Sequence, residues 1–174
     1  RKVEIIPVEF VVRNIAAGSI VKRLGLKEGS VFSRPIIEHY LKKDELGDPL
    51  INEDHIINFQ WGTRDELDEM QEYGLRINDF LRGLFFGIGL KLVDFKIEFG
   101  RYYSEDGNSS LLLADEISPD NCRLWDINTN KKMDKDLFRQ ELGGLKEAYQ
   151  EVANRLGILP EKKKYSSPKP EIVK

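Results

Sequence analysis

The sequence predicts an α+β fold, in which a mixed and largely antiparallel sheet is packed with helices. Residues 90–100 alternate between apolar and charged side chains, as a strand with one buried face does. A turn-rich segment at 104–108 joins this strand to a second apolar run at 109–116, which is typical of a β-hairpin. Between residues 63 and 87, apolar side chains recur at helical spacing, so we expect one long helix to pack on the sheet.

The composition is that of a globular protein with no strong charge bias. The length of 174 residues fits one large domain or a domain with a tail, and 40% apolar residues suffice for a core. The 27 basic and 30 acidic residues give a net charge of -3, so neither nucleic acid nor a membrane is expected as a partner. No apolar run approaches the roughly 20 residues that a bilayer span requires. The sole cysteine, Cys122, excludes an internal disulfide and fits a cytoplasmic location.

The N-terminal segment is predicted to contain strands and a short helix. Residues 3–12 are interpreted as two short strands separated by a proline, and residues 14–19 as a small-residue turn before a helix at 20–24. Backbone N–H groups at such a helix start can hold an anion, and the Ser19 hydroxyl and the nearby Arg13 add donors. An ordinary helix cap with solvated basic neighbours also explains these residues.

The middle of the chain contains a strand, a loop and the long helix. Residues 36–41 are predicted to form a short strand, and residues 43–49 form either a solvated connection or the rim of a substrate site. Thr63 and Glu66 have the spacing of a capping box at the start of the long helix. The apolar stripe of this helix is assigned to the core, and its members are Leu67, Met70, Ile77, Phe80, Leu81, Leu84 and Phe85.

The strand at 90–100 has two contrasting faces. One face carries the apolar row Val93, Phe95, Ile97 and Phe99, and the other carries the charges Asp94, Lys96 and Glu98. The hairpin is expected to bring Asp115, at the end of the second strand, near the charged row. Carboxylate oxygens bind magnesium and a lysine neutralises phosphate, so this group fits a magnesium–nucleotide site. A solvated strand face is the alternative.

The C-terminal part is predicted to be helical and then disordered. Residues 133–139 are interpreted as a helix start with acids in its first turn, and residues 145–156 as a final amphipathic helix. Beyond that helix, the chain is rich in lysine, serine and proline and has little to bury. The expected organisation is one domain at residues 1–157 and a disordered basic tail at 158–174.

Several common kinds of site are not indicated. His39 and His55 are far apart and lack a His or Cys partner at ligand spacing, so a zinc site is not expected. The sequence contains no G-x-S-x-G, C-x-x-C, G-x-G-x-x-G or Walker motif.

Two long motifs stand in order along the chain. The first reads I-I-P-x-E at residues 5–9, followed by Arg13 and then A-G-S at 17–19. The second reads L-V-D-x-K-x-E-F-G at residues 92–100. Together they resemble the SAICAR synthetase (phosphoribosylaminoimidazole-succinocarboxamide synthase) family over about residues 3–157. Shorter segments that also look like this family are 44–49, 118–120, 123–126 and 133–140.

This resemblance implies a ligase of purine biosynthesis. Such an enzyme joins the carboxylate of carboxyaminoimidazole ribonucleotide to the amine of L-aspartate and splits ATP to ADP and phosphate, with Mg2+ as cofactor. The implied architecture is the larger lobe of a two-lobed, kinase-like or ATP-grasp-like fold. The implied assembly is a homo-oligomer, a dimer, in the cytoplasm.

The resemblance also implies roles for individual residues. Asp94 would orient the substrate or accept a proton from the incoming amine, and Lys96 would neutralise charge on the transferring phosphoryl group or the substrate carboxylate. Glu98 and Asp115 would hold magnesium and thereby ATP, and the backbone of Ile5 and Ile6 would touch the adenine edge. The residues expected to hold the phosphate or carboxylate of the ribonucleotide are Arg13, Ser19, Arg123 and Arg139.

The sequence departs from the family pattern at its start. In the family, an N-terminal lobe of strands carries a loop over the ATP phosphates, and this sequence begins near the hinge that follows such a lobe. We therefore expect half of the ATP cleft to lie outside these residues. Two alternatives to the ligase are a kinase-like phosphotransferase acting on another small molecule, and a non-catalytic ribonucleotide-binding fragment.

Overall fold

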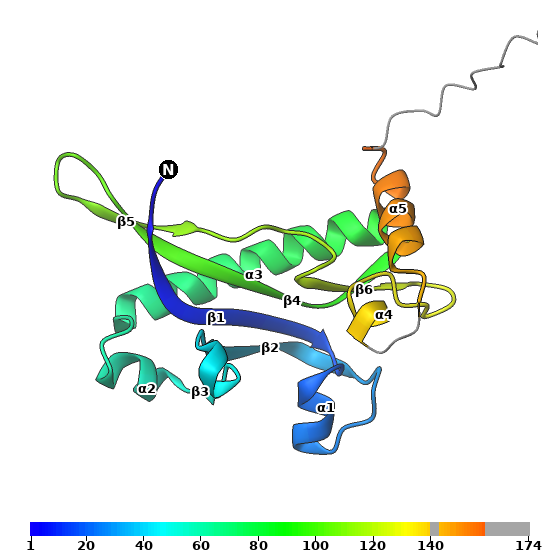
Figure 1. Ribbon diagram of the computed structural model, residues 1–174, viewed down its shortest axis with the longest axis horizontal. Helices are drawn as coiled ribbons and strands as arrows, with labels where there is room; N and C mark the ends of the chain where they lie inside the picture. The colour runs from blue at the N-terminus through cyan, green and yellow to red at the C-terminus, as the bar shows by residue number, and fades with distance from the viewer. Residues whose placement is uncertain (140–142, 159–174) are drawn as a thin grey trace, which may run out of the picture.

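The computed structural model describes residues 1–139 and 143–158, which form a curled sheet with helices around it (Figure 1). The strands are β1 (Glu4–Ile15), β2 (Val31–Leu41), β3 (Leu50–Ile51), β4 (Leu90–Tyr103), β5 (Ser109–Leu113) and β6 (Cys122–Asp126). The helices are α1 (Ser19–Leu24), α2 (Glu53–Asn58), α3 (Arg64–Gly87), α4 (Asp136–Arg139) and α5 (Leu145–Arg155), with a 3-10 turn η1 (Asp44–Leu46).

The sheet follows the order β3-β2-β1-β4-β5, and β6 also pairs with β4. Every pairing between these strands is antiparallel, so the expected mixture of directions is absent from the described residues. The long strand β4 pairs with β6 through its first half and with β5 through its second half, and β1 lies on its other side. The α+β class and the predicted hairpin are confirmed.

The core lies between the sheet and α3, which runs beside β4 (Figure 1). Residues of β1 and β4 that share one face are buried against the helix, because side chains alternate along a strand. Fully burying one such side chain stabilises the fold by about 1.5–3 kcal/mol. The fully buried members with the largest side chains include Phe10, Phe95, Phe99, Ile6, Met70 and Ile97.

Helix α3 begins with the capping box that the sequence predicts. The Thr63 hydroxyl accepts the Glu66 N–H at 3.2 Å, and the Glu66 carboxylate accepts the Thr63 N–H at 2.8 Å. The assignment of the whole apolar stripe to the core is wrong at Phe80 and Leu84, which are 69% and 40% exposed. Each helical residue turns about 100° from the last, so Phe80 lies well away from the buried direction of Leu81.

Two predictions about the strands are corrected. Residues 4–15 form one strand that runs through Pro7. A proline has no backbone N–H to donate to a neighbouring strand. Here the register with β4 shifts between Ile5 and Glu9, so the ladder requires no hydrogen bond from Pro7. The second strand is longer than residues 36–41 and begins at Val31.

The apolar row of β4 is also interrupted. The register between β4 and β6 shifts between Leu92 and Asp94, which leaves Val93 as an extra residue. Val93 therefore leaves the main core and packs in a small second cluster with Ile15, Ala17 and Trp125.

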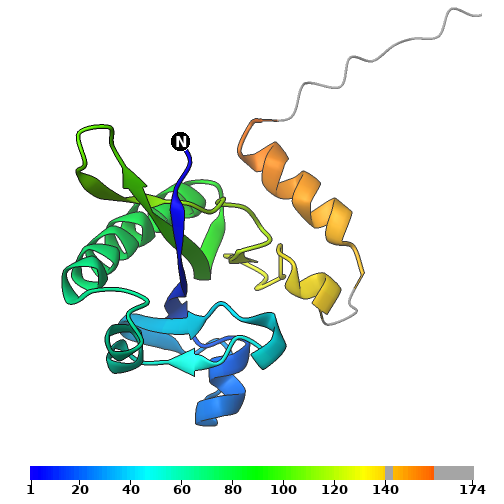
Figure 2. The same cartoon turned by 60° about the vertical axis from the view of Figure 1, so that its left-hand side comes forward.

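Helix α5 stands beside β6 at one end of the molecule (Figures 1 and 2). Ala148 and Val152 are its buried residues. The guanidinium of Arg155 contacts the Asp126 carboxylate at 3.0 Å and the Gly89 carbonyl oxygen at 3.2 Å, which attaches the helix to β6 and to the start of β4. The predicted tail lies outside the described residues from 159 onward. None of the described helices is long and apolar enough to cross a bilayer.

Candidate active site

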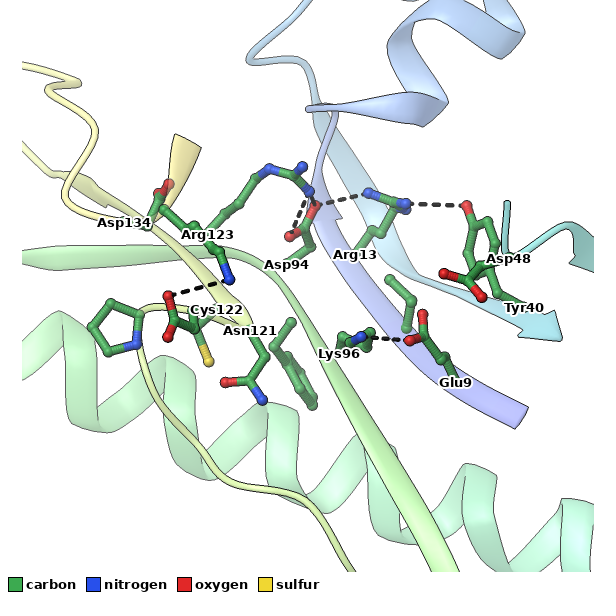
Figure 3. A pocket seen from close by; sticks show the side chains of 15 residues that line it. Glu9, Arg13, Tyr40, Asp48, Asp94, Lys96, Asn121, Cys122, Arg123 and Asp134 are labelled. Atoms are coloured by element: carbon green, nitrogen blue, oxygen red, sulfur yellow. Dashed lines mark hydrogen bonds and ion pairs between the residues drawn. The ribbon is translucent and has the colours of Figure 1, made fainter. Parts of the chain in front are cut away.

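A polar cavity lies on the sheet face that α3 does not cover. It has a volume of about 340 Å³ and lies between β1, β4, the end of β2 and the segment around β6 (Figure 3). Its lining includes Glu9, Arg13, Asp94, Lys96, Arg123 and Asp134. Strand alternation explains this arrangement, because the neighbours of these residues along β1 and β4 face the core.

The register between β1 and β4 sets which side chains meet on this face. Arg13 pairs with Asp94, and Glu9 pairs with Glu98, in the antiparallel ladder. Directly opposed side chains in such a ladder lie about 4.5–5.5 Å apart at Cβ. On this face the charged row of β4 therefore lies beside Glu9 and Arg13 of β1, with the apolar Val11 opposite Lys96.

Asp94 lies at one end of the cavity and is buried, with 3% of its surface exposed. Its carboxylate accepts a hydrogen bond from Nη1 of Arg13 at 2.8 Å and from Nη1 of Arg123 at 2.9 Å. Burial raises the pKa of Asp94, and the two guanidinium groups oppose that shift. The carboxylate thus holds two arginines in fixed positions (Figure 3).

Arg13 is engaged by the protein itself. Its Nε donates to Glu38 at 2.7 Å, and its Nη2 donates to the Ser19 and Tyr40 hydroxyls, each at 3.2 Å. The residue is 3% exposed, so in this state it organises the site. Its direct contact with a ligand stays a prediction.

Arg123 has a donor left for a ligand. Its Nε donates to Asp136 at 2.7 Å and its Nη1 to Asp94, whereas Nη2 donates to no described residue. A Cβ at Gly18 would lie 2.5 Å from this Nη2, so the glycine makes room for the guanidinium. Gly18 has φ +65 and directly precedes Ser19, so the predicted Ser19 lies close to the Arg123 guanidinium, which lines the cavity.

The other end of the charged row contains two lysine–glutamate pairs. Lys96 Nζ lies 2.5 Å from Glu9, and Lys42 Nζ lies 2.5 Å from Glu98. The hydrogen bond to Glu98 raises the pKa of Lys42, and the negative charge of Asp115 adds to this effect. Glu98 and Asp115 therefore act on the same ammonium group, as the predicted hairpin requires.

These two carboxylates fit a magnesium ion that is also bound by phosphates. Among the described residues, no group of three or more acidic, histidine or cysteine side chains is arranged to hold a metal. Magnesium in nucleotide sites is commonly held by one or two carboxylates together with substrate phosphates and water. Glu98 and Asp115 supply that number of hard oxygen ligands, and a cation, Lys42, already contacts Glu98.

Three further residues were predicted for the site, namely Arg139, Ile5 and Ile6. Arg139 ends α4, and its side chain lies outside the described part of the chain. Ile6 is fully buried in the main core, so its backbone alone could face a ligand, whereas Ile5 is 40% exposed. Both roles at the adenine edge stay predictions.

Sequence reasoning missed the contribution of β2 and of the segment after β6. Glu38 and Tyr40 are two residues apart in β2 and therefore lie on the same face of this strand. The period-2 pattern of a strand could have identified them. Asp134 accepts the backbone N–H groups of Leu124 and Asp136, each at 2.8 Å, and burial raises its pKa to about 6. The sequence marks Asp134 as an acid at a predicted helix start and as part of the family-like segment 133–140, but it does not indicate that this carboxylate lines the cavity.

Cys122 lines the cavity but is not a reactive thiol. It is 2% exposed, and burial raises its pKa to about 12. A thiolate is therefore scarce at neutral pH, and Cys122 acts as a small buried residue.

The fold and this cavity define a class of protein. An antiparallel α+β domain presents fixed arginines at one end of a polar cavity, the Lys96–Glu9 pair also lines this cavity, and the Lys42–Glu98 pair lies further along the same charged row. Such an arrangement is typical of enzymes that bind phosphorylated or carboxylated small molecules and neutralise their charge.

Comparison with other proteins identifies the family. A family model described as SAICAR synthetase matches residues 1–156. The phosphoribosylaminoimidazole-succinocarboxamide synthase of Rhodospirillum centenum is 62% identical over 92% of this chain and 63% of its own length. The crystal structure of the Ehrlichia chaffeensis synthase has a TM-score of 0.88 at 52% identity, over 92% of this chain and 67% of that one. The chain belongs to the SAICAR synthetase family.

A further structural relative contains a nucleotide. A SAICAR synthetase in complex with ADP has a TM-score of 0.82 at 43% identity, over 98% of this chain and 67% of that one. The chain thus spans about two thirds of the length of the relatives that it matches.

Proposed function

We propose that a protein containing this chain joins carboxyaminoimidazole ribonucleotide to L-aspartate with ATP as the energy source. The observation that carries this proposal is the row Asp94, Lys96 and Glu98 on the uncovered face of β4, with Arg123 at one end and Asp115 near the other. Membership of the SAICAR synthetase family supports the choice of substrates. The bound ADP of a relative supports the choice of nucleotide.

The proposed chemistry has two steps. The substrate carboxylate attacks the γ-phosphorus of ATP, which releases ADP and leaves an acyl phosphate. The amine of aspartate then attacks the acyl carbon, forms the amide bond, loses a proton and expels phosphate. Phosphorylation is needed because a carboxylate repels nucleophiles and its oxygen is a poor leaving group, so catalysis consists largely of positioning and charge neutralisation.

The chain's own residues divide these tasks. Arg123, with its free Nη2, and Ser19 bind the phosphate or carboxylate of the ribonucleotide, and Asp94 holds Arg123 in place. The Asp94 oxygens already accept from two arginines, which favours this orienting role over proton acceptance. Lys96 neutralises charge that develops during phosphoryl transfer.

Magnesium supplies neutralisation of the ATP phosphates, and Glu98 and Asp115 are the residues that would hold it. The predicted homodimer and the predicted cytoplasmic location accompany this proposal as its expected setting.

The test is turnover of a protein that contains residues 1–174 and any flanking sequence in its gene. ADP release should require both the ribonucleotide and aspartate, and mass spectrometry should detect the amide product. Lys96→Ala should lower kcat about a hundredfold while the KM values change little, because the ammonium acts mainly in the transition state.

Lys91→Ala is the matched control, since Lys91 is on the same strand and contacts Asn130 away from the cavity. It should retain normal turnover. Absence of aspartate-dependent ADP release would contradict the proposed reaction, and a normal kcat in Lys96→Ala would contradict the role of Lys96.

A further inference from the structure

Lys42 reaches across the sheet from β2 to β4. It directly follows β2, and its backbone N–H donates to the Pro7 carbonyl oxygen of β1 at 3.0 Å. Strand β1 lies between β2 and β4, yet the Lys42 ammonium lies 2.5 Å from Glu98 on β4. The side chain therefore passes over β1 to neutralise a carboxylate two strands away.

The charges explain why a cation is held there. Glu9 and Glu98 are directly opposed in the ladder between β1 and β4, and like charges in this arrangement repel each other. Asp115 adds a third negative charge near the Lys42 ammonium. Lys96 contacts Glu9, so Lys42 is the cation that remains for Glu98.

Glu98 is more enclosed than its partner. Its side chain is 11% exposed, whereas that of Lys42 is 45% exposed and can move into solvent. An enclosed carboxylate needs a counterion, because an unpaired buried charge is costly. The ammonium of a half-exposed lysine, in contrast, can leave the carboxylate and enter solvent. This difference in exposure makes Lys42 a replaceable cation and Glu98 a fixed ligand.

We propose that Lys42 is a placeholder cation, which neutralises Glu98 in the metal-free protein and must leave when a divalent metal binds Glu98 and Asp115. This inference rests on the metal site of the proposed function and adds a competing group to it. Lys42 is a positioning residue in this scheme, because it acts through Glu98.

The proposal predicts the sign of an affinity change. Removal of Lys42 should strengthen metal binding, because the metal no longer displaces an ammonium from Glu98. Like charges a few ångström apart repel appreciably even in water, and the mobile side chain relieves part of this repulsion. We expect Lys42→Met to bind Mn2+ about fivefold more tightly than the unchanged protein, and added salt to reduce the difference.

The experiment is a titration of the protein with Mn2+ alone, without nucleotide, in which electron paramagnetic resonance measures the free ion. Lys43→Met is the matched control, since it removes the same charge from the next residue, which is exposed and forms no ion pair with Glu98. Its Mn2+ affinity should stay within about twofold of the unchanged protein. Thermal unfolding supplies a second readout, because Lys42→Met should lower Tm without metal and gain more from Mn2+.

Glu98→Gln separates the two levels of the proposal. If it abolishes Mn2+ binding while Lys42→Met behaves like Lys43→Met, or binds more weakly, the placeholder role is refuted and the metal site stands. If Glu98→Gln leaves Mn2+ binding unchanged, or if no protein binds Mn2+, the metal assignment fails and the placeholder role fails with it.

Discussion

Two glycines of α3 should respond in opposite directions to the same substitution. A Cβ at Gly74 would lie 2.3 Å from Cε1 of Phe10, whereas a Cβ at Gly83 would have no heavy atom within 4 Å. Phe10 is fully buried, and its ring packs edge-on against that of Phe99 with 5.8 Å between the ring centroids. The Phe10 ring therefore cannot easily move aside. Close approach of α3 to β1 therefore depends on Gly74.

The magnitudes follow from packing and helix propensity. Replacing a helical glycine by alanine stabilises a helix by about 0.5–1 kcal/mol, which should be the full effect of Gly83→Ala. At Gly74, overpacking costs about 1–3 kcal/mol or more and outweighs that gain. For a domain of this size, each kcal/mol shifts Tm by about 2–4 °C.

Circular dichroism during thermal unfolding measures both variants. Gly83→Ala should raise Tm slightly, and Gly74→Ala should lower it by several degrees. An increase in Tm for Gly74→Ala would show that the helix and β1 are less closely packed than the structure indicates. A decrease for Gly83→Ala would show that this exposed position contacts something outside the described residues.

Two further predictions concern the cavity. Gly18→Ala should weaken ribonucleotide binding about tenfold in calorimetry and also lower Tm, because φ +65 is strained for alanine and its Cβ would displace Arg123; unchanged affinity would remove Arg123 from the ligand site. Burial raises the folded-state pKa of Asp134 to about 6, above its ordinary value of 3.8, so the folded state binds more protons between those values. This group should therefore lower stability as pH rises from about 4 to 6, and denaturant unfolding of Asp134→Asn should lack that slope; equal slopes in both proteins would contradict the assignment.

Features with local causes were predictable from the sequence. The capping box at Thr63 uses residues three apart, and the turn between β4 and β5 lies within one short polar segment. The alternation of β4 correctly placed Asp94, Lys96 and Glu98 away from α3. The family motifs then connected these residues to a reaction.

Features that depend on register were not predictable. The bulge at Val93 and the shift near Pro7 each arise from pairing with a distant strand, so neither changes the local pattern in a recognisable way. The exposure of Phe80 depends on which side of α3 faces the sheet. The apolar stripe of α3 is broader than the surface that contacts the sheet, so the stripe alone cannot specify which of its residues are buried.

The site shows the same limit in its charges. The sequence predicts that Arg13 helps to bind an anion, because a small-residue turn and a helix start follow it. Its carboxylate partners, Glu38 and Asp94, come from the strands on either side of β1 and were not available to local reasoning. A buried arginine requires such partners, so the sequence identified the residue and the sheet determined its role.

Lys42 extends this argument to function. A lysine in a polar loop after a strand is ordinarily a solvated charge, and its neighbours in sequence give no other indication. The strand order places Glu98 within its reach, and the opposed pair Glu9 and Glu98 creates the need for its charge. Charge balance across three strands therefore explains why Lys42 is held beside Glu98, and the proposed placeholder role depends on this part of the fold and not on any motif.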